Sequence, residues 1–154
     1  MLHRFSKSER LCNQIQIQAI FKKGKAIKSY PFLFIHLSNQ ELELGLNAEH
    51  TNRLEVLGPP ETRELRCRAD GGLSPIQVVV SVSSKKHKRA VVRNRIKRKI
   101  RELYRCSKPM LLEGNQGLKR HYLVILYMSG KEYDFEEMSK AFEEGIKKLK
   151  HEIQ

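Results

Sequence analysis

The chain has 154 residues, enough for one hydrophobic core of ordinary size but not for two. Its formal net charge is +13, from 30 Lys and Arg against 17 Asp and Glu, and this excess indicates a polyanionic partner, nucleic acid before an anionic membrane. Residues 1–10 lack the apolar stretch of a signal peptide, and no apolar run reaches the roughly 18 residues of a membrane span, so we expect a cytoplasmic protein without membrane contact.

The first part of the chain predicts one helix and two strands. Asn13 is suited to cap a helix whose apolar residues recur at helical spacing until Gly24 ends it. Residues 30–37 are apolar and rich in aromatic side chains, which favours a strand. Residues 41–46 alternate polar and apolar, as a half-exposed strand does, and residues 38–40 would join the two strands as a hairpin.

The segment 47–75 has no sustained hydrophobic period. Gly and Pro clusters at 58–60 and 70–72 interrupt it, which is typical of a loop. A loop of this length is unusual inside a small domain. We therefore predict a loop insertion within one domain that spans residues 1–154.

The second half of the chain predicts two further strands and a closing helix. Residues 76–83 are β-branched, and residues 122–128 are apolar, so both favour strands. Asp134 and Glu137 form a capping pair before an amphipathic helix. With a basic helix between the two strands, the order α-β-β-β-α-β-α predicts an α+β sandwich in which helices cover a small, mixed, four-stranded sheet.

Residues 85–105 carry the strongest signal in the sequence, because Lys and Arg dominate them and Glu102 is the single acid. As a helix, this segment has an apolar stripe suited to pack on a sheet, formed by Val92, Ile96, Ile100 and Leu103. Along one edge of the stripe, cations follow each other at a spacing of four residues: Arg89, Arg93, Lys97, Arg101 and Arg105. A merely solvated helix face normally interleaves Glu with Lys, whereas guanidinium groups match phosphate oxygens, so we expect a nucleic-acid backbone as the ligand.

The stretch 88–102, KRAVVRNRIKRKIRE, resembles the signature of the bacterial ribonuclease P protein subunit, an Arg-Asn-Arg helix after a Ser-Val-Ser strand. Arg10-Leu11 and the segment 19–24, AIFKKG, resemble the first helix of that family. The order of elements agrees as well. The resemblance covers most of the chain but not residues 47–75.

This resemblance implies a protein without catalytic residues or a cofactor of its own. The RNA subunit would remove the 5′ leader of precursor tRNA with Mg²⁺, and the protein would bind the ribonuclease P RNA and the precursor. The implied RNA-binding residues, together with their basic neighbours, are Lys85, Lys86, Lys88, Arg89, Arg93, Asn94, Arg95, Lys97, Arg98, Arg101 and Arg105. The implied leader cleft, between the first helix and the sheet, consists of Ile17, Ile20, Phe21 and Ile35.

Within this cleft, Phe21 is the aromatic residue suited to stack on a base, although ordinary core packing is an equal alternative. Ile17 and Ile35 depart from the family pattern, since many members carry an aromatic ring there.

Other functions are open at the level of charge and fold class. A ribosomal or other structural RNA-binding protein without a processing role is the main alternative. A DNA-binding regulator is disfavoured. A recognition helix mixes Asn, Gln and Ser with Arg to read bases, whereas the polar residues of this segment are almost all cationic, so we expect no DNA partner. A self-sufficient nuclease would need clustered carboxylates or paired histidines. The histidines are scattered through the sequence, so we expect no metal site in the protein. Cys12, Cys67 and Cys106 lie far apart, and we expect their thiols to be free.

Overall fold

The computed structural model describes residues 5–6, 8–42, 75–112 and 120–153. The predicted insertion at 47–75 lies outside these residues, except for its last residue. So do residues 43–46 of the predicted second strand.

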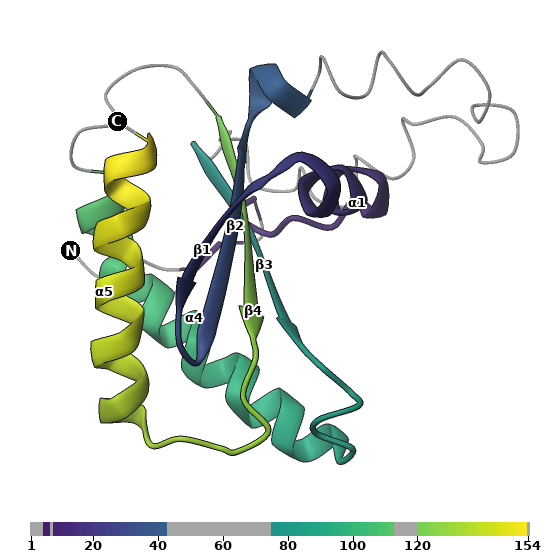
Figure 1. Ribbon diagram of the computed structural model, residues 1–154, viewed down its shortest axis with the longest axis vertical. Helices are drawn as coiled ribbons and strands as arrows, with labels where there is room; N and C mark the ends of the chain where they lie inside the picture. Colours follow the sequence, from purple (N-terminus) through teal and green to yellow (C-terminus); the bar gives the residue numbers. More distant parts are fainter. Residues whose placement is uncertain (1–4, 7, 43–74, 113–119, 154) are drawn as a thin grey trace, which may run out of the picture.

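The fold is built on one four-stranded sheet with the strand order β1-β2-β4-β3 (Figure 1). The strands are β1 (Lys25–Ser29), β2 (Phe32–Ser38), β3 (Ile76–Val82) and β4 (His121–Tyr127). β2 runs antiparallel to both β1 and β4, whereas β3 runs parallel to β4. The sheet is therefore mixed, and the predicted α+β class with four strands is confirmed.

The first hairpin differs from the prediction. The strand that pairs with β2 is Lys25–Ser29, not residues 41–46, and the chain turns at Tyr30 and Pro31. Residues 39–42 form a helical turn, because Ser38 and Glu41 make a capping box. The Ser38 N–H and hydroxyl donate to Glu41 Oε2 at 3.1 and 2.8 Å, and the Glu41 N–H donates to Ser38 Oγ at 3.4 Å. β1 escaped prediction because it is a largely exposed strand with two lysines, as is common at sheet edges.

The helices are α1 (Gln14–Lys23), α4 (Ala90–Leu112) and α5 (Phe135–Ile153). The predicted ends of α1 are confirmed: Asn13 Oδ1 accepts from the Ile15 N–H at 3.0 Å, and the Gly24 N–H donates to Ile20 O at 2.8 Å. Gly24 must lack a side chain, since a Cβ there would lie 2.5 Å from the Ile20 carbonyl oxygen. α4 begins five residues later than the predicted basic segment and extends further toward the C-terminus.

Helices cover both faces of the sheet (Figure 1). α4 and α5 bury one face, in a core that includes Phe34, Ile125 and Ile100. The α4 residues predicted to form its apolar stripe all pack into this core, with Val92 only half-buried. None of the helices within the described ranges combines the length and apolar character needed to cross a membrane.

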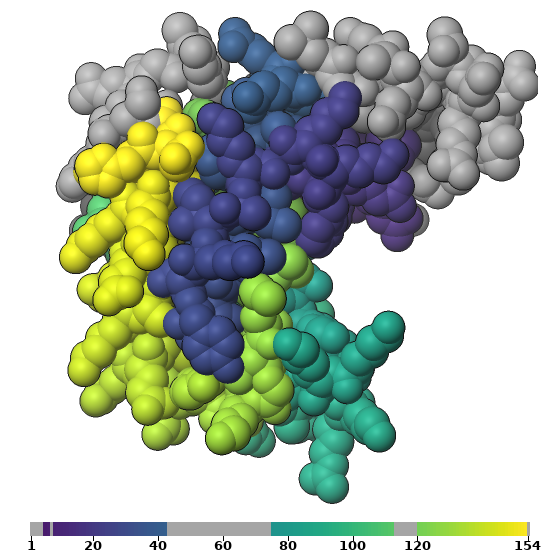
Figure 2. All heavy atoms as spheres, viewed as in Figure 1, coloured from purple at the N-terminus to yellow at the C-terminus, as the bar shows by residue number. Residues whose placement is uncertain are grey.

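On the opposite face, α1 covers one end of β2 and β4, where Ile20 packs with Ile35 and Val124. Beyond α1, the register partners Leu33 and Leu126 remain half-buried. The described residues therefore cover this face only in part. In the space-filling view, the surface is hollowed between α1 in purple and the teal segment that leads into α4 (Figure 2).

Candidate nucleic-acid interface

The loop that leads into α4 is fastened to the end of β4. The His87 N–H donates to Ser83 O at 3.1 Å, which closes a turn. The imidazole of His87 is buried against the Tyr127 ring, and its Nε2 lies 2.9 Å from the carbonyl oxygen of Ser129. The Lys86 ammonium group donates to the carbonyl of Met128. These contacts fix where α4 begins and hence where its cations lie.

Arg93 is tied to the same loop. Its Nη1 donates to the carbonyl oxygens of His87 at 2.8 Å and of Lys88 at 2.7 Å. Both carbonyls precede the helix, so the half-buried guanidinium of Arg93 stabilises the loop as well as adding positive charge. The sequence indicated an RNA contact at Arg93 but not this internal role.

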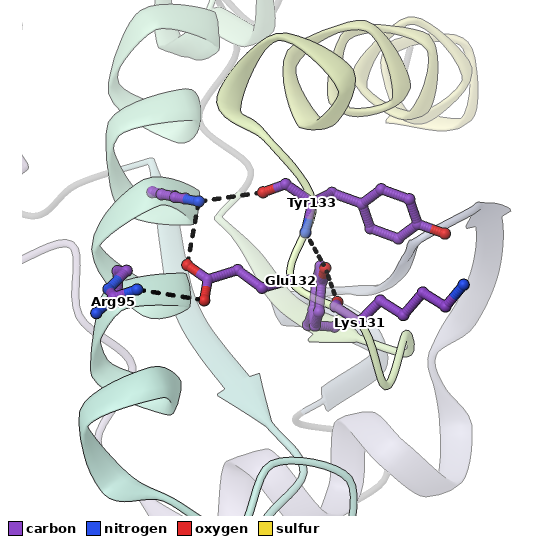
Figure 3. Close-up of polar contacts among 6 residues, drawn as sticks. Arg95, Lys131, Glu132 and Tyr133 are labelled. Atoms are coloured by element: carbon purple, nitrogen blue, oxygen red, sulfur yellow. Dashed lines mark hydrogen bonds and ion pairs between the residues drawn. The ribbon is translucent and has the colours of Figure 1, made fainter.

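Glu132 neutralises one side of α4 (Figure 3). Its carboxylate lies 3.5 Å from Arg95 Nη1 and 3.2 Å from Lys99 Nζ, and Lys99 also donates to the carbonyl of Tyr133 at 3.1 Å. Glu132 comes from the loop between β4 and α5, so this side of α4 faces α5. The Arg95 side chain is half-exposed, which makes its ion pair weak in energy, but the geometry still brings an acid to two of the cations of α4.

Further along α4, Arg105 is paired within the helix. Its guanidinium donates to the Glu102 carboxylate at 2.6 and 3.0 Å, and this interaction lowers the pKa of Glu102 and raises the pKa of Arg105. Arg105 was predicted to bind RNA, but here it is engaged by the single acid of the basic segment.

The other side of α4 carries cations without acidic partners. Within the described ranges, no ion pair or hydrogen bond is found for the side chains of Arg89, Lys97, Arg98 and Arg101. Lys97 is half-buried and the other three are exposed. Asn94 is exposed on the same helix, and Lys85 and Lys88 are exposed in the preceding loop.

Arg101, on this unpaired side of α4, lies near the outer edge of β3. The segment before α1 pairs with that edge: the Val78 N–H donates to Glu9 O at 2.7 Å, and the Leu11 N–H donates to Val78 O at 3.0 Å. Arg10 therefore lies at the edge, and its charge reaches Arg101. Partial loss of hydration first, and then repulsion from Arg10 and Arg98, lowers the pKa of the Arg101 guanidinium. Cations from two separate segments thus gather on one surface.

The four residues of the predicted leader cleft differ in how far they are buried. Ile20 is fully buried and Ile35 is buried, so both form the packing contact that holds α1 on the sheet. Ile17 is half-buried beside them. Phe21 is 47% exposed, and it therefore offers its ring to solvent instead of packing in the core.

Three residues of this region have roles that sequence reasoning did not identify: Arg10, His87 and Glu132. None belongs to a local pattern, because their partners lie on other elements. The signal that could have suggested Arg10 is its position just before the first helix, in the part of the chain that resembled the family.

A family model described as Ribonuclease P matches residues 5–150 of the chain. A curated relative, the ribonuclease P protein component of Porphyromonas gingivalis strain W83, is 29% identical over 143 residues, which cover 92% of this chain and 82% of the relative. The family match thus takes in the sheet, α1 and α4.

Solved structures share the fold. The RNase P protein of Staphylococcus aureus aligns with a TM-score of 0.58 at 19% identity, covering 92% of this chain and 94% of that one. The RNase P protein from Thermotoga maritima aligns with a TM-score of 0.57 at 19% identity, covering 91% and 96%. With the family model spanning nearly the whole chain, the protein belongs to the ribonuclease P protein family, as the protein subunit that partners with ribonuclease P RNA in the endoribonuclease of tRNA 5′ maturation.

Proposed function

We propose that the unpaired side of α4 binds phosphates of the ribonuclease P RNA, and that the hollowed face beside α1 holds the 5′ leader of precursor tRNA. The RNA subunit, with its Mg²⁺, carries out the cleavage, and the protein supplies binding surfaces without a cofactor of its own. The observation that carries this proposal is the gathering of Arg98, Arg101 and Arg10, for which the described residues provide no acidic partner.

Such an arrangement is unfavourable in the free protein. Like charges one turn apart on a helix destabilise it by about 0.2 to 0.5 kcal/mol per pair. Phosphates relieve the repulsion, and Arg is suited to them because its planar group donates two parallel hydrogen bonds. Because the apolar stripe of α4 packs in the core, the backbone that carries Arg98 and Arg101 is held in place against the sheet.

The leader proposal depends on Phe21. A single strand is bound by stacking on flat side chains over a basic surface, and Phe21 is exposed in the last turn of α1 together with Lys22 and Lys23. The packing of Ile20 against the sheet fixes the position of α1 and therefore of the ring.

Reconstitution tests the division of labour. Purified protein is mixed with a bacterial ribonuclease P RNA and a precursor tRNA at low Mg²⁺, and leader cleavage is followed. Cleavage should rise with added protein, and the protein alone should cleave nothing. Cleavage by the protein without RNA would contradict the proposal.

A salt series tests the surface on α4. The quantity measured is K, the association constant of the protein with ribonuclease P RNA. Replacing Lys97, Arg98 and Arg101 with Gln should make the slope of log K against log salt concentration shallower by about 0.7 to 0.9 for each phosphate that the protein no longer neutralises. The control variant removes the same charge from α5, where Lys140, Lys147 and Lys148 are located. Equal changes in both variants would mean that only total charge matters.

A single substitution tests the leader site. Phe21→Leu keeps most of the apolar volume but removes the ring, so affinity for precursor tRNA should fall by up to roughly 1 to 3 kcal/mol, while affinity for mature tRNA stays the same. Phe135→Leu is the control, because Phe135 is similarly exposed, at 43% against 47%, but begins α5 on the other face of the sheet. Equal losses for both tRNAs would refute leader stacking at Phe21.

A further inference from the structure

The turn between β1 and β2 carries the most exposed aromatic side chain in the described part of the protein. Tyr30 is 66% exposed, and Met128 beside it is 39% exposed. The two lie at neighbouring strand ends, since the Met128 N–H donates to Pro31 O at 2.8 Å. Single exposed apolar residues are ordinary on protein surfaces, but here two gather with Tyr133, whose ring centroid is 6.2 Å from that of Tyr30.

The ring of Tyr30 is held in place and keeps an open face. The rings of Tyr30 and Tyr133 are inclined at 87°, and the Tyr133 hydroxyl donates to the Tyr30 hydroxyl at 3.5 Å. In an edge-to-face pair, Tyr133 contacts at most one face of Tyr30. Tyr133 is itself anchored, because its N–H donates to the Tyr127 hydroxyl at 3.3 Å. Tyr30 therefore needs little ordering before a second flat group can stack on it.

Two cations lie on the same side of the molecule as this ring. Hydrogen bonds from Ser129 and Tyr133 chiefly lower the pKa of Tyr30, and the charges of Lys86 and Lys131 lower it further. Lys131 is exposed and extends beside Tyr133, whereas the next residue, Glu132, turns toward Arg95 (Figure 3). In the loop between β4 and α5, Glu132 therefore points to α4, and Lys131 lies beside the pair of tyrosine rings.

We propose that Tyr30, backed by Tyr133 and flanked by Lys86 and Lys131, is a stacking site for one unpaired base of the precursor leader. This inference rests on the proposed function and adds a second contact to the one at Phe21. An aromatic face with cations beside it matches an unstacked base between two phosphates.

The position of the site favours the leader over the ribonuclease P RNA. Arg10 and Arg101 lie together near the edge of β3, whereas Tyr30 lies at the turn of the opposite edge strand. On the face that α1 leaves open, Leu33 and Leu126 lie between the α1 contact at Ile35 and the turn at Tyr30, roughly 15 Å further along β2. A single strand that follows this face from α1 and passes the end of the sheet would meet the turn that carries Tyr30, whose ring partner Tyr133 packs on the face covered by α4 and α5.

A series of precursors with leaders lengthened by one nucleotide at a time tests this site in the reconstituted holoenzyme. With the unchanged protein, affinity should increase at the leader length that reaches Tyr30. Tyr30→Ala should abolish that increase and weaken binding of longer precursors roughly 5- to 150-fold, while short leaders and mature tRNA bind as before. Tyr30→Phe, which keeps the ring, should behave as the unchanged protein does.

Each other outcome overturns the site. If Tyr30→Ala lowers the affinity equally for every leader length, the base that stacks on Tyr30 belongs to the ribonuclease P RNA. If the affinity falls at no leader length, nothing stacks on Tyr30. Melting curves of the free variants check that the fold is intact. Failure of the proposed function is distinguishable, because it would appear with the unchanged protein, as absent activation of the RNA or as affinity independent of the leader.

Discussion

Arg93 and Arg98 both lie on α4, but their surroundings differ. The guanidinium of Arg93 donates to two carbonyls of the preceding loop, whereas Arg98 is exposed and has no hydrogen bond or ion pair among the described residues. Residue type alone does not separate these roles, because both positions belong to the same basic run. A substitution at each position should therefore affect a different property of the protein.

Arg93→Ala should lower the free energy of unfolding by about 1 to 2 kcal/mol, since it removes two charge-assisted hydrogen bonds from carbonyls that precede the helix. Arg98→Ala should change it by less than about 0.5 kcal/mol, as exposed substitutions usually do. Urea unfolding of the free protein measures both values. Equal stability of the two variants would contradict the internal role of Arg93.

His36 makes stability depend on pH. Burial, followed by repulsion from His121 and Lys25, lowers the pKa of His36 below its ordinary value of 6.5. The unfolded chain therefore binds a proton more readily than the folded protein does. Stability should be unaffected by this group above pH 6.5 and should fall as the pH is lowered through 6.5 toward the folded pKa.

Melting temperatures measured between about pH 7.5 and pH 5 test this expectation. The His36→Leu variant should lose less stability on acidification than the unchanged protein. His151→Gln is the control, because it also removes a histidine, but from an exposed position near the end of α5. A profile that is the same in all three proteins would show that His36 does not govern the acid response.

At the level of elements, the described residues give α4 one basic side that Glu132 neutralises and another that has no acidic partner. Glu132 creates this asymmetry from a loop that lies 33 residues beyond Lys99 in the chain. Sequence reasoning correctly predicted the apolar stripe and the basic surface, because both follow from helical spacing within one segment. It could not predict which cations are paired, because that depends on how the loop after β4 is placed against the helix.

The error in the first hairpin came from two local signals that compete in the same segment. The alternation of Glu and Leu from residue 41 onward resembled a strand, but the capping box of Ser38 and Glu41 forms a helical turn at residues 39–42. A local hydrogen-bonded motif outweighed a period-two pattern. Conversely, the edge strand β1 has too few buried residues to produce a clear pattern.

Glu132→Gln should make α4 discriminate less between ribonuclease P RNA and unrelated RNA. The substitution removes the carboxylate from Arg95 and Lys99, so both cations can then bind phosphates. Binding to an unrelated RNA should become stronger, and its salt slope should steepen by about 0.7 to 0.9 for each additional phosphate that the protein neutralises. Glu136→Gln, which removes the same charge from the exposed first turn of α5, is the control. Identical increases in the two variants would mean that the effect is one of net charge.

At the level of the whole molecule, residues 47–75 stay a predicted insertion in a single domain. Deleting residues 51–72 should leave a cooperatively folding protein that still activates the ribonuclease P RNA, because the segment lacks a core-like period and long loops add little to the cost of closure. Thermal unfolding and the cleavage assay measure the two properties. Loss of a cooperative transition would mean that the segment contains a structural element.

The parallel pairing of β3 with β4 has a consequence for how the protein responds to RNA. Parallel neighbours cannot be joined by a tight turn, and here the connection between them contains α4 itself. The helix that we propose to bind RNA therefore lies in the connection between β3 and β4, and its unfolding would expose the core residues of β3. A ligand that binds only the folded form stabilises it by about 2.7 kcal/mol at a hundred times its Kd. Bound RNA should therefore slow amide hydrogen exchange in β3 and β4, strands that it does not need to touch.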